Sequence, residues 1–208
     1  ILTHIGHSEK VFVMRIFIAV IVLIFGLQSW TKADDISDFE IEGMSIGDSL
    51  LDYFSESKIK KNILKQNYKD KTYDTVEFNF LSSFETYDGL NIFIKRNDTK
   101  FIIYAISAMV DFSNDIKGCK KQKDYIVEKL SKLFKGAEVY SRNEDHEQDT
   151  SGESKAFSTY FYINPEYKYP EVAVECYDWS NKMGFRDQLR VSISSNEFET
   201  WLNTKAYD

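Results

Sequence analysis

The alternation of apolar and polar residues is the feature that most constrains this chain of 208 residues. It is clearest in residues 75–80 (TVEFNF), where it has the period of a strand with one buried face. Further strand-like runs cover residues 90–96, 100–111, 156–164, 171–178 and 188–194. Short turn sequences such as Asp88-Gly89 and Asn97-Asp98 separate the first runs, and short links require antiparallel neighbours. The sequence therefore predicts an antiparallel sheet of about six strands.

Helical patterns lie before, between and after these runs. Residues 49–54 form a short helical patch, and a polar helix is expected from Ser55 to about Lys65. The longest pattern begins at a cap formed by Ser113 or Asn114 and reaches residue 135, and a last helix follows Ser195-Asn196. The polar residues 141–155 are predicted to form a loop. The expected fold is α+β in the order ααβββαβββα, with all helices packed on one face of the sheet.

The N-terminal part has the features of a secretory signal peptide, predicted for residues 14–33. Met14-Arg15 gives it a positive start, and an apolar run over residues 16–27 is shorter than a membrane-spanning helix requires. We expect cleavage after Ala33, with an uncleaved N-terminal anchor as the alternative. Residues 1–13 are interpreted as an upstream, non-native segment. Residues 34–208 would then form a single α+β domain in the periplasm or outside the cell.

Export changes the interpretation of the cysteines and of the charge. Cys119 and Cys176 are the two cysteines of the chain, and in an exported protein such a pair predicts a disulfide, with two buried thiols as the alternative. The bridge would join the start of the long helix to a strand beneath it. Residues 34–208 carry 23 basic and 32 acidic side chains, a net charge of −9. This sign argues against nucleic acid as a partner.

One motif matches a hydrolase family. Gly47-Asp48-Ser49-Leu50 has the letters of the nucleophile block of the GDSL hydrolases, whose serine requires a histidine held by an acid. His146 is the one histidine after residue 33, and it is interpreted as a solvated loop residue. We therefore favour a turn and helix cap at Ser49 and predict no catalytic residue. A periplasmic hydrolase that uses Ser49 remains the alternative.

The segment around His146 also invites a calcium interpretation. Glu147, Asp149, Ser151 and Gly152 fall at positions 1, 3, 5 and 6 of an EF-hand-like register. Position 12 is Ser158, where such a loop needs a bidentate glutamate. Neither a metal nor a cofactor is predicted.

Lysines are abundant on the predicted helices. A basic helix layer could meet anionic lipid headgroups, but lysine is also the usual residue of a solvated face, which we favour. Membrane contact is therefore an alternative rather than the prediction. The lysines concerned are Lys58, Lys60, Lys61, Lys65, Lys69, Lys71, Lys117, Lys120, Lys121, Lys123, Lys129, Lys132 and Lys135.

The most distinctive cluster of residues follows Cys176. Tryptophan, phenylalanine and arginine on a strand connection are the residue types that dominate binding surfaces. The candidate binding surface consists of Asp178, Trp179, Phe185, Arg186 and Asp187. The alternative is that Trp179 covers the disulfide and the edge of the core.

Two segments carry a family resemblance. Residues 41–50 (IEGMSIGDSL) and 176–184 (CYDWSNKMG) resemble uncharacterised secreted proteins of small-genome marine alphaproteobacteria. The Gly-Met-Ser opening also resembles the periplasmic SmpA/OmlA-like domains, although their lipidated cysteine is missing here and their sheet has three strands. The second resemblance implies a partner-binding role in the periplasm. Because the sequence offers no complete catalytic set, the favoured prediction is a non-catalytic protein of the cell envelope that binds a periplasmic protein or a small ligand.

Overall fold

The computed structural model describes residues 36–64 and 68–208. The predicted signal peptide, residues 14–33, and the upstream segment, residues 1–13, lie outside the described residues. In the described ranges, no helix is long and apolar enough to span a membrane.

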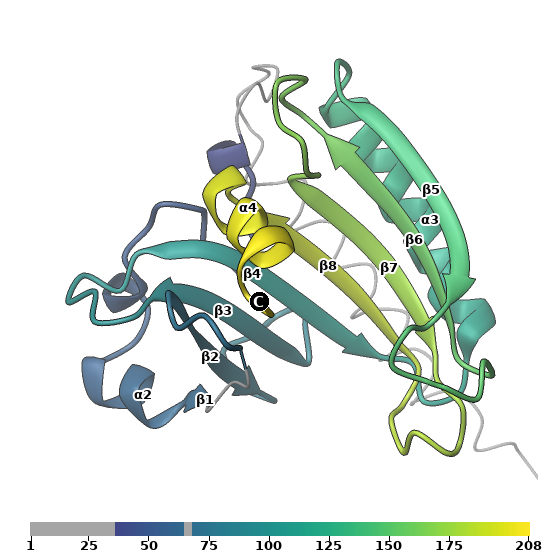
Figure 1. Ribbon diagram of the computed structural model, residues 1–208, viewed down its shortest axis with the longest axis horizontal. Helices are drawn as coiled ribbons and strands as arrows, with labels where there is room; N and C mark the ends of the chain where they lie inside the picture. The colour runs from purple at the N-terminus through teal and green to yellow at the C-terminus, as the bar shows by residue number, and fades with distance from the viewer. Residues whose placement is uncertain (1–35, 65–67) are drawn as a thin grey trace, which may run out of the picture.

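The structure confirms an α+β fold with one antiparallel sheet, but the sheet has eight strands rather than six, in the order β1-β2-β3-β4-β8-β7-β6-β5. Figure 1 shows the sheet from the side on which α4 lies. The strands are β1 (Ile63–Leu64), β2 (Tyr73–Asn79), β3 (Gly89–Lys95), β4 (Ile103–Asp111), β5 (Glu138–Asp145), β6 (Lys155–Tyr162), β7 (Val172–Asp178) and β8 (Gln188–Ser194). The helices are α2 (Glu56–Lys61), α3 (Ile116–Leu133) and α4 (Asn196–Thr204), with short 3₁₀ helices η1 (Ile36–Asp38) and η2 (Leu50–Asp52).

The two additional strands correct the predicted element order. β1 begins at Ile63, in the part of the chain expected to continue the polar helix, and α2 ends at Lys61. β5 covers residues 141–145 of the predicted loop, and residues 146–154 form a loop as predicted. It is an edge strand whose side chains are nearly all exposed, so it lacks the alternation that marks a strand with one buried face.

Two four-stranded meanders make up the sheet. β1–β4 precede α3, and β5–β8 precede α4, so each meander is followed by one helix. The two halves meet along β4 and β8, where Ile106 pairs with Ile193 and Ala108 pairs with Val191. β8 therefore lies in the middle of the sheet although it is the last strand in sequence.

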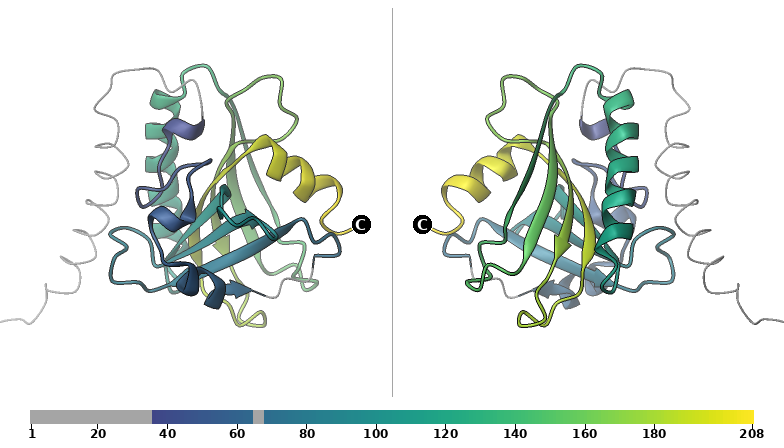
Figure 2. Two further views of the ribbon diagram at one scale, coloured as in Figure 1. Left: turned by 90° about the vertical axis from the view of Figure 1, so that its left-hand side faces the viewer. Right: turned by 90° about the vertical axis from the view of Figure 1, so that its right-hand side faces the viewer.

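The helices lie on both faces of the sheet, which corrects the prediction that they share one face (Figure 2). α3 packs against β7 and β8, over the main core, and the segment that includes η2 and α2 covers the same face. α4 packs on the opposite face, where Phe198 and Trp201 contact Tyr73 and Ala105. Side chains alternate along a strand, so Ala105 and its neighbour Ile106 belong to different layers.

The predicted disulfide between Cys119 and Cys176 is confirmed. The two Cα atoms are 6.0 Å apart, and both side chains are fully buried. The bridge joins the first turn of α3 to β7, as expected. Further along the helix, Ile126 and Leu130 continue the buried face that packs on the sheet.

The helix caps agree with the sequence except at α3. Ser195 caps α4, where its side chain accepts a hydrogen bond from the N–H of Phe198 at 3.2 Å. At α3 the cap is Asp115, whose carboxylate accepts from the N–H of Gly118 at 2.9 Å. Ser113 and Asn114, the predicted caps, have φ angles of 42° and 71° and form the turn that reverses the chain after β4. Their backbone is therefore left-handed and cannot start the helix.

Candidate binding groove

The face of the sheet that carries α4 is only partly covered, and we call it the open face. Two adjoining cavities lie on it, with volumes of about 400 Å³ and 310 Å³. Ser107 of β4 and Arg190 of β8 line both cavities. We refer to the two together as the groove, to the first as its aromatic end and to the second as its α4 end.

The floor of the groove is built on the carboxylate of Glu175 in β7. Oε1 accepts hydrogen bonds from the hydroxyls of Ser158 at 2.9 Å and Tyr160 at 3.1 Å, and Oε2 accepts from the hydroxyl of Tyr177 at 2.9 Å. Burial and the charge of Glu175 raise the pKa of Tyr177, so this phenol stays protonated and remains a donor. The three hydroxyls hold Glu175 in one place on the floor.

Arg190 stands next to Glu175 in the sheet, because the two residues pair between β7 and β8. Its guanidinium carbon lies 5.4 Å from the centre of the Tyr177 ring. Among the residues that the structure describes, it forms no hydrogen bond or ion pair. The Arg190 guanidinium thus lies at the junction of the two cavities, and its N–H groups donate to no described residue.

Aromatic side chains form the wall of the aromatic end. The rings of Trp179 and His146 have centroids 4.2 Å apart, and Phe185 lies edge-on to Trp179 at 4.9 Å. Tyr177 stacks on Trp179 at 5.7 Å. His146 lies in a loop, as predicted, but its side chain is half-buried in this ring cluster rather than fully solvated. The backbone N–H of Gln148 donates to its Nδ1 at 3.3 Å.

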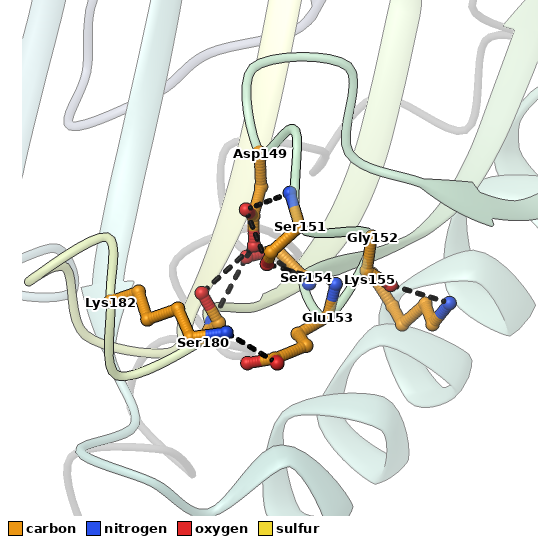
Figure 3. A network of polar contacts seen from close by, with 8 residues as sticks. All are labelled: Asp149, Ser151, Gly152, Glu153, Ser154, Lys155, Ser180 and Lys182. Atoms are coloured by element: carbon orange, nitrogen blue, oxygen red, sulfur yellow. Dashed lines mark hydrogen bonds and ion pairs between the residues drawn. The ribbon is translucent and has the colours of Figure 1, made fainter.

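A buried carboxylate fixes the two loops that carry this wall (Figure 3). Asp149 accepts hydrogen bonds from the hydroxyls of Ser151 at 2.6 Å, Ser154 at 2.6 Å and Ser180 at 2.8 Å. The backbone N–H groups of Ser151 and Ser154 also donate to it. Ser180 follows Trp179 directly, so the network joins the loop of His146 to the loop of Trp179. The same hydrogen bonds keep the pKa of Asp149 far below its ordinary value.

The same network occupies the carboxylate that a calcium ion would need in this loop. The oxygens of Asp149 face donors supplied by the protein itself rather than a vacant coordination site. Within residues 36–64 and 68–208, no group of three or more histidine, cysteine or acidic side chains is arranged to hold a metal ion.

The α4 end of the groove combines rings with acidic side chains. Burial raises the pKa of Glu199, and the charge of Glu175 adds to the shift. Burial also raises the pKa of Tyr68, to about 12, so its hydroxyl stays neutral in the physiological range. Tyr207 lies edge-on to Tyr68 at 5.4 Å. The C-terminal residues thereby close this end.

The structure divides the predicted binding surface into two groups. Trp179 and Phe185 line the aromatic end. The other three residues are outside the cavity lining: Asp187 is buried and accepts from the N–H of Trp179 at 2.9 Å, and Arg186 pairs with Asp111 at 2.7 Å. Asp178 ends β7, paired with Lys155 in the sheet register. Burial and neighbouring carboxylates raise the pKa of Asp187.

Trp179 and the disulfide face opposite sides of the sheet. Tyr177 belongs to the open face, whereas its neighbour Cys176 belongs to the core beneath α3. Trp179 packs with Tyr177 and lines the same cavity, so it forms part of the groove wall and does not cover the disulfide.

Four groove residues were not predicted from the sequence: Arg190, Glu175, Tyr160 and Ser107. All four are polar residues at the alternate positions of strands whose apolar positions face the core. Alternation therefore indicated which face they occupy. It did not indicate that four strands would bring them together.

Ser49 lies away from the groove lining and acts as a cap. Its hydroxyl donates to the carbonyl of Lys100 at 2.7 Å and accepts from the N–H of Leu51 at 3.3 Å, at the start of η2. The partners given by these contacts are backbone groups, and none is a histidine. This arrangement gives the hydroxyl a structural role.

The lysines of the predicted basic layer are partly engaged in contacts. Lys123 is buried under α3 and donates to the hydroxyl of Thr159 at 2.9 Å. Lys120 lies 3.9 Å from the ring centre of Phe157, and Lys58 lies 4.6 Å from that of Phe54. Lys132 pairs with Glu128 along the helix. These contacts weaken the case for one continuous cationic face.

Comparisons with family models, curated proteins and solved structures found no match to this chain. The groove therefore has to be interpreted from its own chemistry.

Proposed function

We propose that this chain is an exported, non-catalytic binding protein and that the groove on its open face holds a small ligand. The observation that carries the proposal is the pair of adjoining cavities, whose walls are aromatic and whose floor is polar. Ligand sites in proteins combine these features, with a few fixed polar groups that orient the ligand.

Two further observations support the proposal. The polar groups of the floor and the loops of the wall are held by hydrogen bonds to Glu175 and Asp149, so the site is largely pre-formed. The disulfide between Cys119 and Cys176 fits an oxidising compartment and thus an exported chain, as the predicted signal peptide would require.

The proposal is tested by mapping where small molecules bind. A library of small aromatic and polar fragments is added to ¹⁵N-labelled protein, and backbone amide shifts are recorded. We expect the shifts to gather at groove residues such as Tyr177, Arg190 and Ser192. Ser107→Trp, which fills the floor, should abolish them, whereas Leu51→Trp, at an exposed position of η2, should not.

Two results would contradict the proposal. One is a set of fragment shifts that lie on α3 or are spread over the whole surface. The other is ester hydrolysis, measured with a panel of nitrophenyl esters, that disappears in Ser49→Ala, because this would make the chain a hydrolase.

A further inference from the structure

Two hydrogen-bond donors without partners belong to residues that line the aromatic end of the groove. The guanidinium of Arg190 makes no hydrogen bond or ion pair with a described residue, and its carbon lies 5.4 Å from the centre of the Tyr177 ring. The indole Nε1 of Trp179 is buried and also has no acceptor among the described residues. A buried donor such as the Trp179 indole normally has an acceptor, and the half-buried guanidinium of Arg190 offers charged donors to an anion in the same cavity.

Glu175 is the nearest candidate counter-ion in the sheet register, but its carboxylate oxygens already accept hydrogen bonds from other residues. It pairs with Arg190 in the sheet register, yet three hydroxyls, from Ser158, Tyr160 and Tyr177, donate to its two carboxylate oxygens. No ion pair forms between them, although Arg96, Arg142 and Arg186 each have one with a carboxylate. Arg190 is the exception among the four arginines that the structure describes.

The missing partner must therefore supply acceptor atoms and negative charge. A carboxylate or a phosphate does both and can accept two parallel N–H bonds from one guanidinium. A small inorganic anion alone fits poorly, because Glu77 also lines this cavity and Glu175 pairs with Arg190 in the sheet register. The ligand needs an additional source of affinity.

The aromatic wall offers that source. Trp179, Phe185 and His146 form a ring cluster at one side of the cavity, where a flat apolar group could stack. The cavity volume of about 400 Å³ lies within the range of small-molecule sites, roughly 300–1,000 Å³. We propose that the aromatic end binds a small aromatic anion whose carboxylate or phosphate is held by Arg190 and whose ring packs against Trp179 and Phe185. This inference rests on the proposed function of the groove.

The test compares probes that differ in charge but hardly in shape. N-acetyl-phenylalanine, its uncharged amide, phenyl phosphate, acetate and inorganic phosphate are titrated into the full chain by calorimetry. We expect one or both aromatic anions to bind, and the amide to bind about tenfold more weakly or worse. Acetate and inorganic phosphate should show no measurable binding. The better of the two aromatic anions identifies the anionic group.

Variants then assign the effect to Arg190. Arg190→Gln should reduce the preference for acid over amide to less than about twofold. Arg96→Gln removes the same charge at a residue that lies outside the cavity lining and already pairs with Asp74, and should keep the preference. Trp179→Phe retains a ring but loses the N–H, and should weaken the aromatic anions by a few fold.

The outcomes separate this inference from the proposed function. If the amide binds as tightly as the acid, or if Arg190→Gln keeps the preference, the anion inference is overturned while the groove remains a ligand site. If no probe binds and the fragments leave the groove amides unshifted, both proposals fail. The acid and amide comparison uses the natural chain, so it gives an answer even if Arg190→Gln does not fold.

Discussion

The carboxylate of Asp149 accepts a hydrogen bond of 2.8 Å from the hydroxyl of Ser180, 31 positions further along the chain. This one contact links the loop that carries His146 to the loop that carries Trp179. The order of the groove wall thus depends on a buried acid that does not itself line the cavity.

We expect Asp149→Asn to destabilise both loops at neutral pH, because an amide cannot accept all the hydrogen bonds that the carboxylate accepts. The folded-state pKa of Asp149 lies below its ordinary value of 3.8. Its contribution to stability is therefore complete above that value and is lost as the pH falls below it. Thermal unfolding at several pH values checks this. The gap between the natural chain and the variant should be widest near pH 7 and shrink below about pH 4, and a constant gap would argue against it.

Loss of the disulfide should strongly destabilise the protein. The bridge joins residues 57 positions apart, for which chain entropy predicts about 4 kcal/mol. Urea unfolding of a Cys119→Ser, Cys176→Ser double variant should show a decrease of this order in the free energy of unfolding. Reducing agent should destabilise the natural chain and leave the double variant unchanged. A decrease below about 1 kcal/mol would contradict the expectation.

Ser49→Ala should cost about 1 kcal/mol, the usual value for loss of a helix cap. Its hydroxyl has two backbone partners, the N–H of Leu51 and the carbonyl of Lys100, and both hydrogen bonds are lost in the variant. Denaturant unfolding measures the cost, and fragment binding in the groove should be unaffected. Ser83→Ala, at an exposed position outside the helices and strands, provides the control.

Trp201→Ala should cost about 3–5 kcal/mol, as for other buried aromatic residues. Trp201 is 4% exposed, packs on Tyr73 and donates from its indole N–H to Asp70 at 2.7 Å. Since it attaches α4 to the open face, amide hydrogen exchange in α4 should accelerate more than exchange in α3. Equal acceleration in the two helices would show that the variant acts on the whole fold.

The sequence predicted those strands that have one buried face, because burial imposes the alternation. β5 was not predicted because its side chains are exposed on both faces and therefore show no alternation. β1 was not predicted because its two residues, Ile63 and Leu64, are too few to show a period. The last helix was predicted from its apolar residues and its cap at Ser195. Which face it covers depends on where Tyr73 and Ala105 come together, and no local pattern contains that information.

The same limit applies to the groove. Trp179 and Phe185 were found because their residue types are unusual on a strand connection. Arg190 and Ser107 look like ordinary polar positions until β4 and β8 pair, 83 residues apart, and place them at one junction. The disulfide could be predicted because two cysteines, in a chain expected to be exported, leave one pairing.

The central place of β8 has a consequence for the order in which the protein can fold. As the chain is synthesised, residues up to Asp178 contain β1–β4 and β5–β7. The strand that joins these two groups, β8, has not yet been made. β4 and β7 each keep a long unpaired edge until Gln188–Ser194 emerge and pair with both. The nascent chain therefore cannot complete its core before Gln188–Ser194 have been made. A chain shortened before Gln188 would not be a smaller version of this fold but two open sheets prone to self-association.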